Sequence, residues 1–129
     1  MSLNPQHAQI GTGFVQRYYA AFDGDESARA GLADFYSDGK SLVTIEGDQI
    51  TGRQSIVRRI ENLGFQKIQR IITSTDTQPT GDGGVLIVVA GQIRTTDEPA
   101  QPFHDTFVLK PAEESFFVEH HVFRLGQPA

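Results

Sequence analysis

The stretch Val85-Leu86-Ile87-Val88-Val89-Ala90 decides the fold class of this chain of 129 residues. Successive side chains of a β-strand point to opposite faces of the sheet, so a strand built from this run is apolar on both faces. An antiparallel sheet with one face in water would alternate apolar and polar residues instead. The segment 79–84, just before the run, is rich in turn residues and predicts a hairpin connection to an earlier strand.

Strands dominate the second half of the chain. Turn residues divide this half into four long predicted strands, at about 67–78, 85–95, 103–111 and 115–125. A shorter pair of strands is predicted earlier in the chain, at 41–46 and 49–51, around the turn Gly47-Asp48.

The first half of the chain is mainly helical. Ile10, Phe14, Tyr18 and Phe22 recur every four residues, which gives a broad apolar stripe at helical spacing. Two further helices are predicted, at about 26–36 and 53–63. Helices followed by long strands predict one α+β domain, residues 1–129, in which three helices pack on one face of an antiparallel sheet.

The predicted helices leave the second face of the sheet without a cover. Phe116-Phe117-Val118 and Val122-Phe123 lack alternation in the same way as the central strand. A second copy of the chain is the simplest cover for this face. We therefore expect a homodimer joined sheet to sheet, with Val122 in the contact. The alternative is a central strand that is merely apolar.

Charge and composition exclude several classes of protein. The formal net charge is 11 − 16 = −5, and a net-acidic domain repels phosphate backbones, so no nucleic-acid partner is expected. The absence of cysteine excludes disulfides, thiolate zinc sites and thiol nucleophiles. No run approaches the roughly 18 apolar residues of a membrane span, and no signal peptide is recognisable. We expect a cytosolic or nuclear protein that does not bind membranes.

No pattern predicts a metal or cofactor site. His120 and His121 are neighbours in a predicted strand and face opposite sides, as do His104 and Asp105. Gly81-Asp82-Gly83-Gly84 precedes a strand, whereas a phosphate-binding glycine loop precedes a helix. The expected cofactor content is therefore none.

The ionisable residues leave alternatives open. Glu46, Asp97 and Glu98 are expected in turns or at strand ends, where acidic groups either bind a partner or are simply solvated. An enzyme would need an ionisable group with a tuned pKa inside the fold. The candidates for that role are Asp105, Tyr18 and Tyr19.

Short strings along the chain resemble, in order, those of the nuclear transport factor 2 family. Each string is weak alone, but the ordered set spans about residues 5–125 at nearly the family's spacing. The strings are Ile10-Gly11, Phe14, Tyr18-Tyr19, Phe22-Asp23-Gly24-Asp25, Phe65-Gln66-Lys67-Ile68-Gln69, Gln78-Pro79, Gly91-Gln92, Asp97-Glu98-Pro99, Phe103-His104 and Phe123-Arg124-Leu125.

The resemblance implies a cone-shaped α+β fold with a curved antiparallel sheet, a deep apolar cavity and a homodimer, without catalysis. The family carries the GDP-bound form of the small GTPase Ran into the nucleus and binds FxFG repeats of nucleoporins. The implied location is the cytoplasm and nucleus, with enrichment at the nuclear envelope and nuclear pore. The same fold also hosts small-molecule isomerases and dehydratases, so an enzyme that uses the cavity is the alternative function. A scaffold module of this fold is a third class, and the stand-alone carrier is the expected one.

The resemblance also implies site residues. Those that would bind Ran are Glu46, Asp97, Glu98 and Arg70. Those that would line the cavity are Ile45, Leu63, Ile68 and Phe123. The position that would receive a nucleoporin phenylalanine is His7.

Four positions depart from the family pattern. Thr96 stands where the family often has an aspartate, which removes one charge from the acidic rim of the cavity that would meet basic residues of Ran. Arg70 stands where a histidine follows the glutamine string, and Ile45 replaces a tryptophan of some members, which leaves more room in the cavity. His7 replaces an aromatic residue and is a poorer apolar platform, so weaker FxFG binding is expected.

Overall fold

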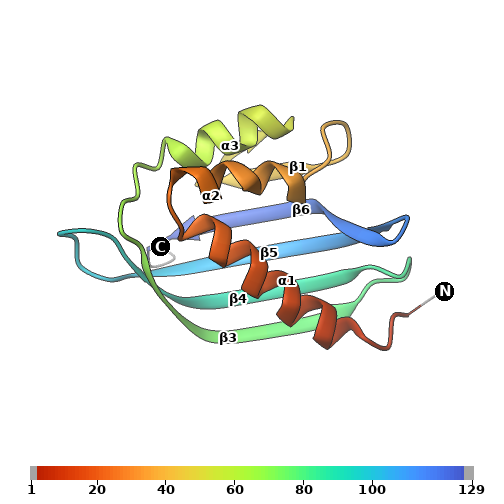
Figure 1. Ribbon diagram of the computed structural model, residues 1–129. Coiled ribbons are helices and arrows are strands. Elements are labelled where there is room, and N and C mark those ends of the chain that lie inside the picture. The colour runs from red at the N-terminus through yellow and green to blue at the C-terminus, as the bar shows by residue number, and fades with distance from the viewer. Residues whose placement is uncertain (1–2, 127–129) are drawn as a thin grey trace.

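Six strands form one curved sheet in the order β2-β1-β6-β5-β4-β3 (Figure 1). The computed structural model describes residues 3–126. The strands are β1 Leu42–Ile45, β2 Asp48–Ile50, β3 Gln69–Pro79, β4 Val85–Arg94, β5 Gln101–Ala112 and β6 Ser115–Leu125. The four long strands were all predicted, with ends displaced by up to two residues. For example, β3 begins at Gln69 because Lys67 has a φ of 47°, outside the strand region.

Strand β4 contains the apolar run. Its inward residues Val85, Ile87 and Val89 are completely buried, whereas the outward Val88 is 39% exposed. The neighbouring strands β3 and β5 both run antiparallel to β4. Both faces of this strand are therefore apolar, and only one of them is covered.

The sheet is mixed, which corrects the expectation of a purely antiparallel sheet. Strand β1 pairs antiparallel with β2 and parallel with β6, so that Ile45 lies beside Phe123. Parallel neighbours cannot be joined by a tight hairpin. Here the chain passes through α3 and three long strands between β1 and β6. The direction of this pair is therefore set by the tertiary path of the chain.

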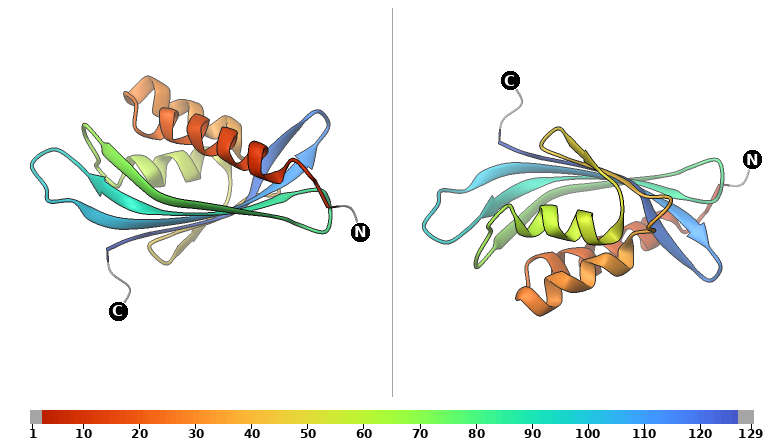
Figure 2. Two further views of the ribbon diagram at one scale, coloured as in Figure 1. Left: turned by 90° about the horizontal axis from the view of Figure 1, so that it is seen from below. Right: turned by 90° about the horizontal axis from the view of Figure 1, so that it is seen from above.

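Helices α1 His7–Phe22, α2 Glu26–Ala30 and α3 Arg53–Glu61 and the 3₁₀ helix η1 Gly31–Phe35 lie on the inner face of the sheet (Figure 2). Phe14, Tyr18 and Phe22 form the buried stripe of α1, and the ring of Phe14 meets that of Phe107 on β5 edge-on at 4.9 Å between centroids. The single helix predicted at 26–36 is two pieces, α2 and η1. Asp25 caps the first of them by accepting a hydrogen bond from the backbone N–H of Ala28 at 2.8 Å.

The outer face of the sheet carries no helix (Figure 2). Large apolar side chains of strands β3, β4 and β6 are exposed on this face: Ile71, Val88 and Val122. Burying such side chains is worth roughly 1.5–3 kcal/mol each. This face is therefore available to a second copy, and the homodimer stays a prediction. Within residues 3–126, no helix has the length and apolar character needed to cross a bilayer.

Candidate functional site

Glu46 is positioned by the end of strand β6. Its backbone N–H donates to the carbonyl of Phe123 at 3.0 Å, and its carboxylate accepts a hydrogen bond from the N–H of Leu125. The residue adopts a φ of 51° in the turn between β1 and β2, followed by Gly47 at 91°. The carboxylate is exposed. An acidic group is thus held beside Ile45 and Phe123, which are both buried.

The loop between β4 and β5 lies at the same end of the sheet as the turn that follows β1, because Ile45 pairs with Phe123 and Leu125 pairs with Phe103 at the start of β5 (Figure 1). Thr96 holds this loop against the segment after α3, because its N–H donates to the carbonyl of Gln66 at 3.1 Å and its hydroxyl to the same oxygen at 3.2 Å. Asp97, with a φ of 64°, and Glu98 are exposed in this loop. The carboxylates of Glu46, Asp97 and Glu98 therefore lie exposed at one end of the sheet.

The four residues expected to line the cavity all belong to, or pack against, the main apolar core. Ile45 and Phe123 are buried, and Leu63 and Ile68 are half-buried. The ring of Phe22 lies 6.5 Å from that of Phe123. Two hollows open near this end, with volumes of about 370 and 260 Å³, and Lys67 lines both. Neither is lined by the four expected residues, so the deep apolar cavity stays a prediction.

Arg70 lies inside the fold rather than on its surface. Its side chain is 4% exposed, and two of its nitrogens donate to Asp23 at 2.8 Å each. Its guanidinium also lies over the ring of Tyr19, with 3.9 Å from Cζ to the centroid. Burial alone would lower the pKa of Arg70, but the hydrogen bonds with Asp23 and its charge raise it above the ordinary value. Nη1 of Arg70 is buried without a hydrogen-bond partner. The guanidinium therefore joins β3 to the end of α1 and offers little surface to a partner.

A chain of hydrogen bonds crosses the interior under α1. Asp105 accepts from the hydroxyl of Tyr19 at 2.6 Å and lies 2.6 Å from Nε2 of His121. Nδ1 of His121 lies 3.1 Å from the hydroxyl of Tyr36, which lies 2.7 Å from that of Tyr18. All five side chains are buried. Burial, reinforced by the Asp105 charge, raises the pKa of Tyr19, and burial also raises those of Tyr18 and Tyr36.

Sequence reasoning named Asp105, Tyr18 and Tyr19 as ionisable candidates but missed Tyr36 and His121. The period-two pattern of the strands is the signal that could have found His121. Asp105 and Phe107 share the inner face of β5, and Phe107 pairs with His121 on β6. His120, on the opposite face, is exposed. Among residues 3–126, no cluster of three metal-binding side chains exists. Asp105 and His121 are buried and line none of the four pockets of about 370, 260, 410 and 180 Å³ in this part of the chain.

His7 begins α1 at the opposite end of the sheet from Glu46 (Figure 1). Its Nδ1 lies 2.8 Å from the hydroxyl of Thr77 on β3, and the residue is half-buried. Val122 lies on the outer face and is 44% exposed. The residues expected to meet Ran, the nucleoporins and a second copy therefore occupy three separate surfaces.

Comparison with known proteins agrees with this architecture. A curated relative, "Probable nuclear transport factor 2" from Caenorhabditis elegans, is 43% identical over 128 residues, with 97% of this chain and 96% of the relative covered. The solved nuclear transport factor 2 of Cryptosporidium parvum is 35% identical with a TM-score of 0.89, covering 98% of this chain and 99% of that chain. A putative dehydratase from the NTF2-like family of Streptomyces avermitilis shares the fold alone, at 17% identity and a TM-score of 0.70, over 90% of this chain and 94% of that one. Residues 10–125 match the description "Nuclear transport factor 2 (NTF2) domain", and the chain therefore belongs to the nuclear transport factor 2 family.

Proposed function

We propose that this protein carries the GDP-bound form of Ran into the nucleus and passes the nuclear pore by binding FxFG repeats weakly. The relatives' names support a role in nuclear transport. The structural observation that carries the proposal is the pairing of β1 with β6. It holds the Glu46 carboxylate at the surface beside Ile45 and Phe123, at the end where Asp97 and Glu98 are also exposed.

An aromatic side chain from Ran would supply most of the affinity. A phenylalanine buries roughly 150–250 Å² when enclosed. At about 25 cal/mol/Å², this burial gives about 4–6 kcal/mol before the cost of association. One aromatic anchor can therefore dominate a small interface. The proposed walls of its pocket are Ile45, Leu63, Ile68 and Phe123.

The acidic rim would choose the partner. Glu46, Asp97 and Glu98 attract basic residues of Ran, which speeds encounter and suppresses acidic competitors. Arg70 would support these residues indirectly, because its buried ion pair with Asp23 stabilises the fold, and it would not contact Ran. State selectivity follows if Ran presents its aromatic residue only in the GDP form. The carrier then discriminates between the two forms without touching the nucleotide.

The nucleoporin contacts would be shallow and weak so that the carrier leaves each repeat. His7 is the proposed contact on α1. A homodimer joined through the outer face around Val122 would present two copies of each site, which raises the effective concentration of repeats. The protein would then move between cytoplasm and nucleus and concentrate at the nuclear envelope.

The deciding experiment is a pull-down with Ran loaded with GDP or with a non-hydrolysable GTP analogue. We expect retention of the GDP form only and loss of that retention in the Glu46→Lys variant. Equal retention of both forms, or of neither, contradicts the proposal.

The interior hydrogen-bond chain favours one second candidate, an isomerase or dehydratase of small molecules. Asp105 and His121 are ionisable groups within 2.6 Å of each other inside the fold. Against this candidate, both side chains are buried and line none of the four pockets described among residues 3–126. Turnover of an apolar ketone that disappears in Asp105→Asn would favour the enzyme, and its absence at high protein concentration would count against it.

A further inference from the structure

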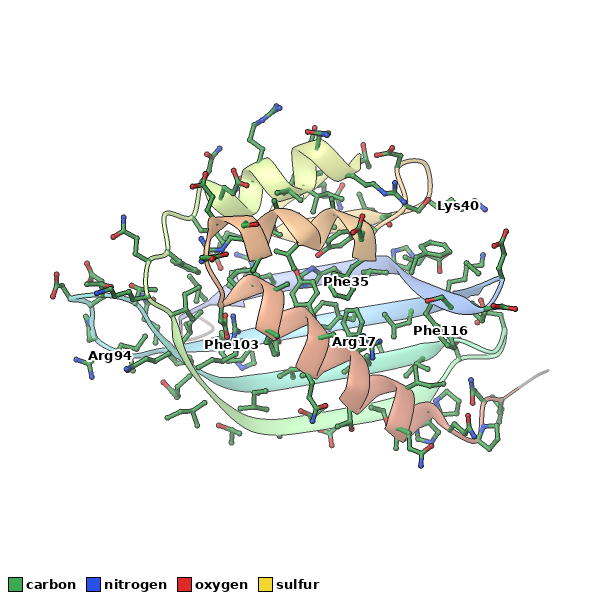
Figure 3. The ribbon with its side chains drawn as sticks, in the orientation of Figure 1. Arg17, Phe35, Lys40, Arg94, Phe103 and Phe116 are labelled. Carbon is green, nitrogen blue, oxygen red and sulfur yellow. The ribbon has the colours of Figure 1, made fainter. Side chains whose placement is uncertain are left out.

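A small pocket, lined by apolar side chains together with Arg17, Asp34 and Ser115, lies between α1, η1 and the hairpin that joins β5 to β6. Its volume is about 180 Å³. Figure 3 labels one residue from each of these elements, Arg17, Phe35 and Phe116. No residue expected to bind Ran, a nucleoporin or a second copy lines this pocket. It is therefore distinct from the sites proposed above.

The size of the pocket suits one aromatic ring. An apolar protein cavity of about 150 Å³ binds benzene. A pocket of about 180 Å³ thus has room for a phenyl group but little beyond it.

Five of the eight residues that line the pocket are apolar, and three of these are phenylalanines. Ile10 and Phe14 come from α1, Phe35 from η1, and Leu109 and Phe116 from β5 and β6. The rings of Phe14 and Phe35 meet edge-on, 5.5 Å apart at 86°. Ile10, Phe35 and Phe116 are only half-buried, so a further ring can complete the cluster.

Two residues of opposite charge are among those that line the pocket. Arg17 and Asp34 line the pocket and are both exposed. Among residues 3–126, neither forms an ion pair or a side-chain hydrogen bond. A guanidinium donates to a peptide carbonyl and a carboxylate accepts from a peptide N–H. The two side chains can therefore form hydrogen bonds with the backbone of an uncharged extended peptide whose ring enters the pocket.

We propose that this pocket takes the phenylalanine side chain of an extended, uncharged peptide. The identification of that peptide as an FxFG repeat rests on the proposed function. The pocket then gives each chain a second attachment point besides His7. It also supplies the aromatic surroundings that His7 lacks.

The test is titration of the ¹⁵N-labelled full chain with an FxFG peptide, followed by NMR. We expect shifts at the amides of Arg17, Asp34 and Phe116, and none with a peptide in which serine replaces both phenylalanines. Ser115→Phe, at an exposed position that lines the pocket, should weaken binding at least about tenfold by filling it. Glu114→Phe, an exposed neighbour that does not line the pocket, should change binding by less than about twofold.

A second variant guards against an indirect effect of Ser115→Phe on folding. Arg17→Ala alters only an exposed side chain and should weaken binding a few-fold through the lost donor. If the peptide binds but shifts only residues around His7 and ignores both variants, the pocket is wrong while the nucleoporin role stands. If the FxFG peptide binds nowhere, the nucleoporin part of the proposed function is overturned together with the pocket.

Discussion

Two carboxylates, Asp105 and Glu46, show how burial decides what the same chemical group does. Asp105 is buried and has two side-chain hydrogen-bond partners, Tyr19 and His121. Glu46 is exposed, and its carboxylate accepts one hydrogen bond, from the backbone N–H of Leu125. Asp105 lies on β5 and Glu46 is held by the end of β6, the neighbouring strand. Only Glu46 is accessible to a second molecule. The comparison separates groups that hold the fold together from groups available for recognition.

The largest expected effect is the loss of the buried carboxylate. Asp105→Ala should lower the free energy of unfolding by about 3–5 kcal/mol, because it leaves the Tyr19 hydroxyl and His121 without their buried acceptor. Urea unfolding followed by circular dichroism measures the change. Glu98→Ala, the exposed control, should stay within about 0.5 kcal/mol of the wild type. A similarly small change for Asp105→Ala would remove the interior chain from the stabilising contacts.

A carboxylate introduced on the outer face of the sheet tests a third environment, the proposed contact between two copies of the chain. Val122→Glu should raise the dissociation constant of the proposed homodimer at least about 100-fold, because the contact would bury an unpaired charge. Analytical ultracentrifugation over a concentration series reports this constant. A dimer that persists unchanged in this variant would place the contact elsewhere than around Val122.

The exposed carboxylate should affect partner binding more than folding. Glu46→Lys is expected to weaken binding of GDP-loaded Ran by about 2 kcal/mol, since it reverses a charge at the proposed rim. Calorimetry gives the affinity, and urea unfolding checks that the fold persists. Unchanged affinity would remove Glu46 from the site and reduce it to a turn residue that caps β6.

Alkaline pH should weaken the interior specifically. Burial raises the pKa values of Tyr18, Tyr19 and Tyr36 in the folded chain, and Asp105 raises that of Tyr19 further. Their stabilising contribution is fully present below the unfolded value of about 10 and is lost as the pH rises above it. Each tyrosine contributes a slope of up to about 1.4 kcal/mol per pH unit there. Unfolding by urea at pH 9, 10 and 11 measures the slope, which Tyr36→Phe should reduce.

The smallest expected effect concerns His7. His7→Ala removes a contact with Thr77 and a weak platform for a nucleoporin phenylalanine, so FxFG affinity should fall by less than about tenfold. Peptide titration followed by NMR measures the change. Unchanged shifts and affinity would move the nucleoporin contact away from the start of α1.

Sequence reasoning anticipated the candidate site only in part. The strand pattern placed Glu46 at the end of a strand and Asp97 and Glu98 in a turn, and the resemblance to the family grouped the three as Ran-binding residues. The structure has all three exposed at one end of the sheet. The same reasoning placed Arg70 on the binding surface. In the structure Arg70 is buried in an ion pair with Asp23, which lies 47 residues away along the chain. No local sequence pattern reveals a partner at that separation.

The sequence by itself determined the helices, the long strands, the α+β class and the apolar outer face, because periodicity and turn residues act over a few positions. Only the tertiary structure decided the parallel pairing of β1 with β6, the inward position of Arg70 and the meeting of Asp105 with His121. Each of these depends on which strand lies beside which, and in what register. That choice is made when the whole sheet packs against its helices.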